Sequence, residues 1–295
     1  MASSTQVEVP TSSLQVEPRL EEVAEVLPAQ KDHDYRSYAN APQHVVRFYH
    51  ENHLKQTYSF ALAQKLKYGA LDSGFEMGIW EAAELLNELV DESDPDTNVT
   101  HPWPSSLLSE ALRVAYPGEE YDWLHLTGFI HDLGKVLGHP KMFNQPQWAV
   151  VGDTFPTGCA YASDIIFSEF FLENADANHP VYSTKYGVYE PNCGLDNVVM
   201  SWGHDEYMYQ VCVGNNCTLP APALHIIRFH SFYAHHSKEA YTHLMNEHDR
   251  EMLVWLRAFQ KCDLYSKVDE VIDVDKLKGY YLKAIAKYFP KTLKW

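Results

Sequence analysis

The sequence of 295 residues is poor in basic residues and cysteines, and it contains no long apolar run. Lysine and arginine number 23 against 40 acidic residues, so the formal net charge is −17. This charge repels phosphate backbones and anionic lipids, which argues against nucleic acids and membrane surfaces as partners. No apolar run approaches the length of a bilayer span, and residues 1–10 lack the pattern of a secretion signal. The five cysteines include no CxxC pair and are typical of reduced thiols, so we expect a cytoplasmic protein.

Apolar residues make up 45% of the sequence and aromatic residues 13%, which is enough for one large core. Residues 1–33 are rich in Ser, Glu, Pro and Val without a sustained period, which predicts a mobile N-terminal tail. From residue 34 to 295, apolar residues recur mainly at helical spacing, and the alternation typical of strands is scarce. We therefore expect a single, mainly α-helical domain.

The predicted helices cover Gln43–Tyr68, Met77–Val90, Leu107–Ala115, Trp123–Val136, Asp164–Leu172, Leu195–Gln210, Ala221–Ala234, Lys238–Lys261 and Val274–Tyr288. Ser105 or Ser106 is the expected N-cap of the third, because a serine side chain accepts a hydrogen bond from the first helical turn.

The strongest local signal is FIHDLGK at residues 129–135, where His131 and Asp132 are flanked by apolar residues. In an interior helix, two buried ionisable groups are costly unless charged or metallic partners compensate them. A neutral imidazole nitrogen and a carboxylate oxygen together suit iron, zinc or manganese. Taken alone, the pair is better explained by a hydrogen-bonded core histidine beside a helix-capping aspartate.

Three further residues occur in similar apolar or aromatic settings: His204 in SWGHDE, His230 in IIRFHSF and Asp263 in KCDLY. Each falls on a different predicted helix. The order HD…H…H…D resembles the ligand order of the HD-domain superfamily. The sequence therefore predicts a metal site whose ligands come from separate helices of one HD-type catalytic domain over residues 34–295.

Six longer blocks resemble the myo-inositol oxygenase family, in order, between Tyr35 and Trp295. They are DESDPD at 91–96, HDLGK at 131–135, WAVVGDTFP at 148–156, SWGHDEYMYQ at 201–210, RFHSFY at 228–233 and DLYSK at 263–267. The resemblance implies a mixed-valent Fe(II)/Fe(III) di-iron site that uses dioxygen to open myo-inositol to D-glucuronate. It further implies that Asp132 bridges the irons, with His131 and Asp263 on one and His204 and His230 on the other.

The resemblance also implies a substrate site and a monomeric enzyme. Because the implied substrate is uncharged, it must be recognised through hydrogen bonds to its hydroxyl groups. The residues implied to contact it are Arg36, Asp91, Glu92, Ser93, Lys135, Gly152, Asp153, His230 and Ser231. Lys135 lies four residues after His131, one turn away if the helix continues, and could assist deprotonation of the bound substrate.

One position departs from the family pattern, which has a further histidine ligand on the helix before the HD segment. Counting forward from DESDPD places that ligand at Pro104, and counting backward from Trp123 places it near Ser106. The nearest histidine is His101, which precedes a proline and would therefore approach from an extended loop. Alternatives are a water molecule in this position or a weaker iron pocket.

Two other functions remain open at this point. An HD-type metal phosphohydrolase would need a cationic phosphate site, but only Lys135 and Lys267 lie near the predicted ligands. A catalytically impaired homologue that only binds inositol is favoured by the altered histidine position alone. Iron content distinguishes this homologue from the oxygenase, and phosphatase turnover distinguishes the phosphohydrolase.

Overall fold

The computed structural model describes residues 38, 40–93, 104–265 and 274–295. The predicted tail, Arg36 and His101 lie outside the described residues. The helices are α2 (Gln43–Lys55), α3 (Tyr58–Gly69), α4 (Ile79–Leu86), α5 (Pro104–Ala115), α6 (Asp122–Ile130), α7 (His204–Gly214), α8 (Ala221–Phe229), α9 (Tyr233–His236), α10 (Glu247–Tyr265) and α11 (Val274–Tyr288). The described strands are β1 (Glu76–Met77) and β2 (Leu293–Lys294). The mainly α-helical fold expected from the sequence is confirmed.

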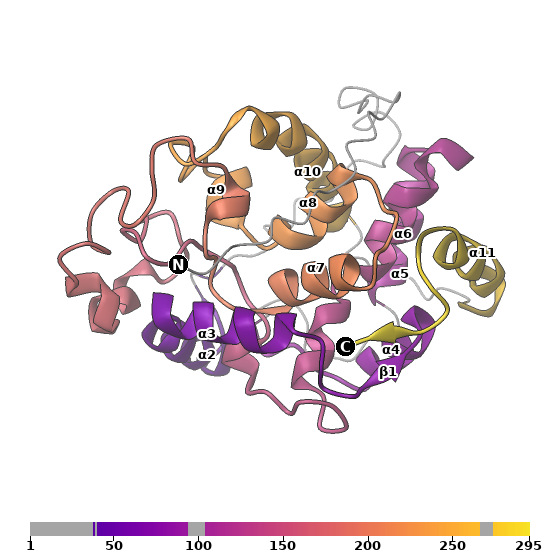
Figure 1. Ribbon diagram of the computed structural model, residues 1–295, viewed down its shortest axis with the longest axis horizontal. Helices are drawn as coiled ribbons and strands as arrows, with labels where there is room; N and C mark the ends of the chain where they lie inside the picture. Colours follow the sequence, from indigo (N-terminus) through magenta and orange to yellow (C-terminus); the bar gives the residue numbers. More distant parts are fainter. Residues whose placement is uncertain (1–37, 39, 94–103, 266–273) are drawn as a thin grey trace.

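Helix α8 lies at the centre of the molecule and packs against α6, α7 and α10 (Figure 1). All residues of α6 from Trp123 to Ile130 are buried, as are those of α8 from Pro222 to Phe229. A helix that is buried all round must satisfy or compensate every polar group it carries. The histidines next to these helices therefore lie in the interior of the protein.

The outer elements cover this centre from several sides. Helix α3 packs on α7, and α2 packs on the 3₁₀ segment Ser168–Glu173. Helix α11 packs on α6. Strand β2 pairs with β1 in antiparallel register, with Leu293 opposite Met77, and the indole of Trp295 donates to the Met77 carbonyl at 3.0 Å. The C-terminal segment is thus part of the packed structure.

The helix predicted over Gln43–Tyr68 is two helices, because the chain turns at Gln56 and Thr57. The Thr57 hydroxyl caps α3 by accepting a hydrogen bond from the Phe60 N–H at 3.2 Å. The Gln56 side chain is buried and exchanges two hydrogen bonds with the backbone of Trp202, at 2.7 and 2.9 Å. Periodicity does not separate the two helices, since both present apolar faces to the same core.

Two other predicted helices are wrong over part of their length. Within Asp164–Leu172 only a short 3₁₀ helix forms, Ser168–Glu173, after Phe167 takes a left-handed conformation with φ of 50°. Within Leu195–Gln210, residues 195–197 form a 3₁₀ turn and α7 starts only at His204. The Ser201 N–H instead donates to the Phe155 carbonyl, which holds this stretch extended.

Two helix starts also differ from the prediction. Helix α10 begins at Glu247 rather than near Lys238, because Asn246 and Asp249 cap each other: each backbone N–H donates to the other side chain at 2.9 Å. Helix α5 begins at Pro104, which suits proline because the first helical residue needs no N–H donor. Neither Ser105 nor Ser106 is therefore the N-cap. None of the helices in the described ranges combines the length and apolar character needed to cross a lipid bilayer.

Candidate metal centre

His131 and Asp132 lie where α6 ends, and not within a continuous helix as predicted. Helix α6 stops at Ile130, and the chain continues as a 3₁₀ helix over Leu133–Gly138. This change of helix type lets two adjacent side chains approach one centre, although successive residues of an α-helix point in different directions. The backbone of Gly134 lies close to the His204 carbonyl group. A Cβ atom at position 134 would lie 2.1 Å from that carbonyl oxygen, so only glycine fits there.

Three histidines are oriented by the same kind of hydrogen bond. The Nδ1 atom of His131 bonds the Gly128 carbonyl at 2.8 Å, that of His204 the Val150 carbonyl at 2.8 Å, and that of His230 a carbonyl of α8 at 3.1 Å. A carbonyl oxygen only accepts, so each Nδ1 carries the hydrogen. The Nε2 atom of each ring is then available as a metal ligand.

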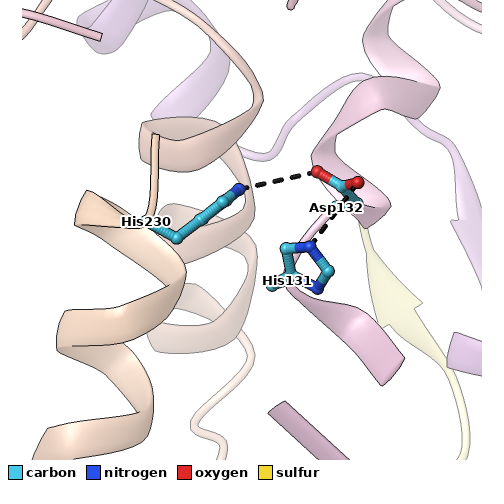
Figure 2. Close-up of side chains that lie close together, drawn as sticks. All are labelled: His131, Asp132 and His230. Atoms are coloured by element: carbon cyan, nitrogen blue, oxygen red, sulfur yellow. Dashed lines mark ion pairs between the residues drawn. The ribbon is translucent and has the colours of Figure 1, made fainter. Parts of the chain in front are cut away.

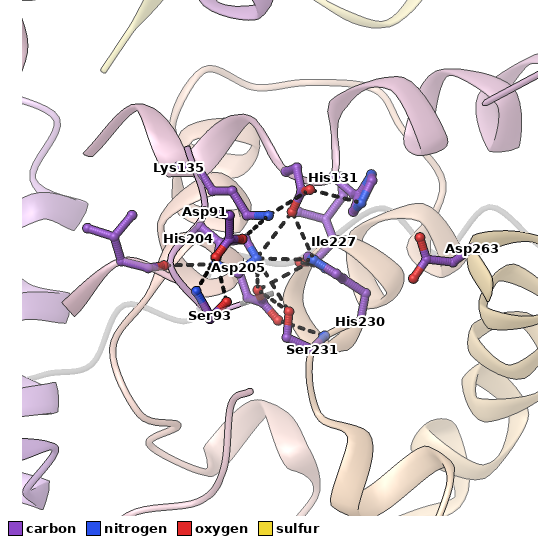
Figure 3. Close-up of polar contacts among 12 residues, drawn as sticks. Asp91, Ser93, His131, Lys135, His204, Asp205, Ile227, His230, Ser231 and Asp263 are labelled. Atoms are coloured by element: carbon purple, nitrogen blue, oxygen red, sulfur yellow. Dashed lines mark hydrogen bonds and ion pairs between the residues drawn. The ribbon is translucent and has the colours of Figure 1, made fainter. Parts of the chain in front are cut away.

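The three Nε2 atoms meet at the carboxylate of Asp132 (Figures 2 and 3). One oxygen of Asp132 lies 3.5 Å from the Nε2 atom of His131. The other oxygen lies 3.3 Å from His204 and 3.5 Å from His230. Asp132 therefore faces two sets of imidazoles with its two oxygens, which is the arrangement of a bridging carboxylate.

Asp205 is a further member that the sequence analysis missed. Its carboxylate lies 2.8 Å from the Nε2 atom of His204 and accepts hydrogen bonds from the N–H and hydroxyl of Ser231 at 3.1 and 3.0 Å. The sequence contains a signal for Asp205, because the His-Asp pair at 204–205 repeats the His-Asp pair at 131–132. The potential ligands fall into two groups that share His230; together we name them the His–Asp cluster, consisting of His131, Asp132, His204, Asp205 and His230.

Asp263 lies on α10 and is not part of either group (Figure 3). Its carboxylate accepts a hydrogen bond from the Tyr233 hydroxyl at 3.4 Å. Its charge still acts on the cluster: burial lowers the pKa of His131, while Asp132 and, to a smaller extent, Asp263 oppose that shift. The structure thus brings four of the five firmly predicted ligands together and leaves Asp263 beside them.

Lys135 lies between two carboxylates at the edge of the cluster. Its ammonium group is 2.9 Å from Asp132 and 2.9 Å from Asp91. Burial lowers the pKa of Lys135, but Asp132 and Asp91 outweigh burial and raise the pKa above its ordinary value. Lys135 is therefore a cation, three residues from Asp132 in a 3₁₀ helix rather than one α-helical turn from His131.

The segment around Asp91 holds this lysine in place. The Ser93 N–H and hydroxyl donate to Asp91 at 2.9 and 2.5 Å, so the second oxygen of Asp91 faces Lys135. Burial raises the pKa of Asp91, and Lys135 and Ser93 more than reverse that shift. Glu92, in contrast, is exposed.

A second predicted substrate segment, residues 150–154, is bonded directly to the cluster. The Val150 carbonyl accepts from His204, and the Thr154 N–H donates to the Ser231 carbonyl at 2.9 Å. Gly152 has φ of 93°, and a Cβ atom there would lie 2.8 Å from Phe48. Asp153 is buried and accepts from the Tyr49 hydroxyl at 3.4 Å.

The charges of this region favour a bound cation. Burial raises the pKa of Asp132, but Lys135 and His131 outweigh it and hold the pKa well below its ordinary value. Burial lowers the pKa of His204, but Asp205 and Asp132 raise it to about 10. The carboxylates of Asp91, Asp132 and Asp205 outnumber Lys135, and a bound cation would take the place of the proton that they favour on His204. Carboxylate oxygens with three imidazole nitrogens suit iron, zinc or manganese.

Comparisons with known proteins identify the family of this chain. A family model described as myo-inositol oxygenase matches residues 42–295. The chain belongs to the myo-inositol oxygenase family. The inositol oxygenase of Dictyostelium discoideum is 53% identical over 89% of this chain and 90% of its own length. Inositol oxygenase 1 of Arabidopsis thaliana is 53% identical over 89% of this chain and 83% of its own length. The human inositol oxygenase is 46% identical over 88% of this chain and 90% of its own length.

The chain is thus an enzyme, an inositol oxygenase and an oxidoreductase. The resemblance predicted from the six sequence blocks is confirmed, and the matched range includes the whole His–Asp cluster.

In this inositol oxygenase a second group of charges, of which Glu206 and Arg228 are buried, joins α7 to α8, which position His204 and His230. We name Lys65, Asp196, Glu206 and Arg228 the Glu206 network. Glu206 lies 2.7 Å from the Arg228 Nε atom and 2.9 Å from the Lys65 ammonium group. Arg228 also lies 2.7 Å from Asp196. The sequence analysis did not identify this network, because its members are far apart in the chain.

Proposed function

We propose that the enzyme holds two iron ions, in the mixed-valent Fe(II)/Fe(III) state, and opens the ring of myo-inositol with dioxygen to give D-glucuronate. The observation that carries the proposal is the position of Asp132, whose two oxygens face His131 on one side and His204 with His230 on the other. A carboxylate in that position can hold two cations close together and share its charge between them.

In this proposal His131 and Asp132 hold one iron, and His204, His230 and the second oxygen of Asp132 hold the other. Asp263 is assigned to the first iron on the family resemblance alone, and His101 is the nearest candidate for the family's further histidine, with water or a weaker iron pocket as alternatives. Bound iron supplies the redox chemistry with dioxygen and acidifies a coordinated hydroxyl group.

Lys135 acts on the substrate as a cation. A protonated ammonium group cannot accept a proton, so Lys135 donates hydrogen bonds to a substrate hydroxyl and stabilises the negative charge that appears when that hydroxyl loses its proton. Asp91 keeps the ammonium group aimed at this place, and Ser93 keeps Asp91 in position. In this role Lys135 assists deprotonation of the substrate without itself accepting the proton.

The hydroxyl groups of the substrate require further donors and acceptors. We assign these to Asp91, Glu92, Ser93, Gly152, Asp153, Ser231 and Arg36. Their support is the bonding of residues 150–154 to His204 and Ser231, which places this segment next to the cluster. An analogue with a misplaced hydroxyl leaves buried partners unpaired, which gives the site its selectivity.

The phosphohydrolase alternative is disfavoured because carboxylates outnumber the cation at the cluster, which repels a phosphate ester. The five cysteines are free thiols. Together with the acidic charge and the family resemblance, this supports a monomeric enzyme in the cytoplasm.

The test is oxygen uptake by protein that has been reconstituted with ferrous iron and a mild reductant, with glucuronate quantified in the same tube. We expect uptake that depends on myo-inositol, with one glucuronate formed for each dioxygen consumed. A folded, iron-loaded protein that consumes no oxygen would overturn the proposal in favour of an impaired inositol-binding homologue. Release of phosphate from phosphate esters would instead favour the hydrolase.

A further inference from the structure

The C-terminal end of α7 carries a specific helix-ending motif. The helix ends at Gly214, and Asn216 then takes a left-handed conformation with φ of 54°. The Cys217 N–H donates to the Cys212 carbonyl at 3.0 Å, and the Asn216 N–H donates to the Val213 carbonyl at 3.0 Å. These two bonds around one left-handed residue define a Schellman motif.

A Schellman motif brings two particular side chains into contact. They belong to the residue that accepts the outer hydrogen bond and the residue that donates it, and they are commonly both apolar. Here both are cysteines, Cys212 and Cys217. The thiol of each acts on the pKa of the other, as expected for side chains that face each other across this motif. The local backbone therefore brings the two sulfur atoms together, although the residues are five positions apart in the sequence.

The two thiols differ in environment, and the difference favours reaction. The Cys212 thiol lowers the pKa of Cys217, and the backbone of Leu219 contributes in the same direction, while burial opposes both. Burial, with the same thiol contact, raises the pKa of Cys212 well above its ordinary value. Cys217 is partly exposed and Cys212 is buried, so Cys217 is the more acidic thiol and the sulfur that an oxidant can reach.

We propose that Cys212 and Cys217 are a modification site that a peroxide oxidises to a reversible disulfide. The Cys217 thiolate attacks hydrogen peroxide, the O–O bond breaks, and Cys217 sulfenic acid and hydroxide form. The Cys212 sulfur then attacks the sulfenic sulfur, the S–S bond forms and the oxygen leaves as water with the Cys212 proton. The two sulfurs lose two electrons, and the peroxide gains them.

This disulfide would close the turn between α7 and α8, which contacts the C-terminal segment. The Asn215 side chain donates to the Lys294 carbonyl at 2.8 Å and accepts from the Lys294 N–H at 2.7 Å. The Thr218 N–H donates to the Tyr288 carbonyl at 2.9 Å. A covalent bond across the motif therefore strengthens the place where α7, α11 and β2 meet, ten residues from His204 at the other end of α7.

A second pair of cysteines must be distinguished. Burial raises the pKa of Cys159, and the nearby Cys193 adds a smaller contribution in the same direction. Cys159 and Cys193 are therefore also close to each other. No hydrogen bond between those two thiols contributes to that shift, and Cys193 donates instead to the Leu244 carbonyl at 3.9 Å.

Peptide mapping separates the two pairs. The sequence has no lysine or arginine between Lys185 and Arg228, so trypsin leaves Cys193, Cys212 and Cys217 in one peptide and Cys159 in another. After stoichiometric hydrogen peroxide and alkylation of the full-length protein, we expect this peptide to be lighter by two hydrogen atoms and alkylated only at Cys193. Dithiothreitol should restore all three alkylations.

The stability of the folded protein gives a second readout. We expect oxidation to raise the melting temperature by about 2–5 °C, in a way that dithiothreitol reverses. Cys217→Ser should abolish the mass change and the thermal shift, whereas the matched variant Cys193→Ser should keep both. The proposal would be overturned if Cys212 and Cys217 remained free thiols after peroxide treatment, or if their peptide became linked to the peptide that contains Cys159. The peptide map of the wild-type protein gives this answer even if a variant fails to fold.

Discussion

Two groups of charges meet on α7 at the adjacent residues Asp205 and Glu206, and they differ in how their charges balance. The Glu206 network contains the carboxylates of Glu206 and Asp196 and the cations of Arg228 and Lys65, so it is neutral. The neighbouring His–Asp cluster has Lys135 as its cation against the carboxylates of Asp91, Asp132 and Asp205 among the described residues.

The difference separates a structural role from a functional one. A buried ion pair that is complete holds its elements together, and breaking it leaves an uncompensated charge. A cluster with excess negative charge is destabilised by that excess and gains free energy when it binds a cation. The three imidazoles of the cluster have their Nδ1 atoms bonded to backbone carbonyls and turn their Nε2 atoms toward the carboxylates, where a metal ion can bind.

The largest expected effect comes from Asp132→Asn, which removes the carboxylate that we propose bridges the two irons. Changes to residues behind the ligands typically cost 10–100-fold in metal affinity or activity, so loss of this ligand should lower inositol-dependent oxygen uptake by more than ~100-fold. The free energy of unfolding of the metal-free protein should change by less than about 1 kcal/mol, because Lys135 keeps Asp91 as its partner.

Elemental analysis of iron, oxygen uptake and urea unfolding measure these three quantities on one preparation. A variant that keeps full iron and activity would show that Asp132 does not bridge. A variant that loses several kcal/mol of stability would contradict the comparison, because the cluster would then be as structural as the Glu206 network.

The sequence predicted the helical fold and the residues of the centre better than it predicted their geometry. Helix α11 has the predicted bounds, Val274–Tyr288, because its apolar period and the end at Phe289-Pro290 are local signals. The break after Ile130 has no comparable signal, since apolar residues continue through Val136. Where several segments are buried on all sides, periodicity no longer shows where a helix ends.

The same limit explains which site residues were missed. Asp205 belongs to the cluster because α7 begins at His204, and its partner Ser231 comes from the residue after His230, at the end of another helix. Such a contact depends on how α7 packs against α8. Asp263 shows the converse: its motif predicts a ligand, but its position on α10 places it beside the cluster.

A smaller effect, on stability rather than metal binding, is expected for Glu206→Gln. Arg228 lies 2.7 Å from both Glu206 and Asp196, but the side chain of Glu206 is 5% exposed and that of Asp196 is 60% exposed. Loss of the buried partner should cost about 3–5 kcal/mol. The matched control Asp196→Asn should cost less than about 1 kcal/mol. Equal losses in urea unfolding would show that burial does not separate the two pairs.

The pH dependence of this variant provides a further check. Burial raises the pKa of Glu206, but Arg228 and Lys65 outweigh burial, so the folded pKa lies below the ordinary value of 4.5. The stabilisation is therefore complete above pH 4.5 and is lost as the pH falls through the folded pKa. The stability difference between wild type and Glu206→Gln should shrink below pH 4.5, and a constant difference would contradict this origin.

The smallest expected effect concerns His101, which the sequence offers in place of the family's further histidine and which lies outside the described residues. If His101 supplies that ligand, His101→Ala should lower iron occupancy and turnover together by about tenfold, since the His–Asp cluster keeps its other ligands. His44→Ala, at an exposed histidine of α2, is the matched control and should change neither quantity. Unchanged iron content and turnover in His101→Ala would leave that position to water or to a weaker iron pocket. The excess negative charge of the cluster would then have to retain the metal without a fourth imidazole.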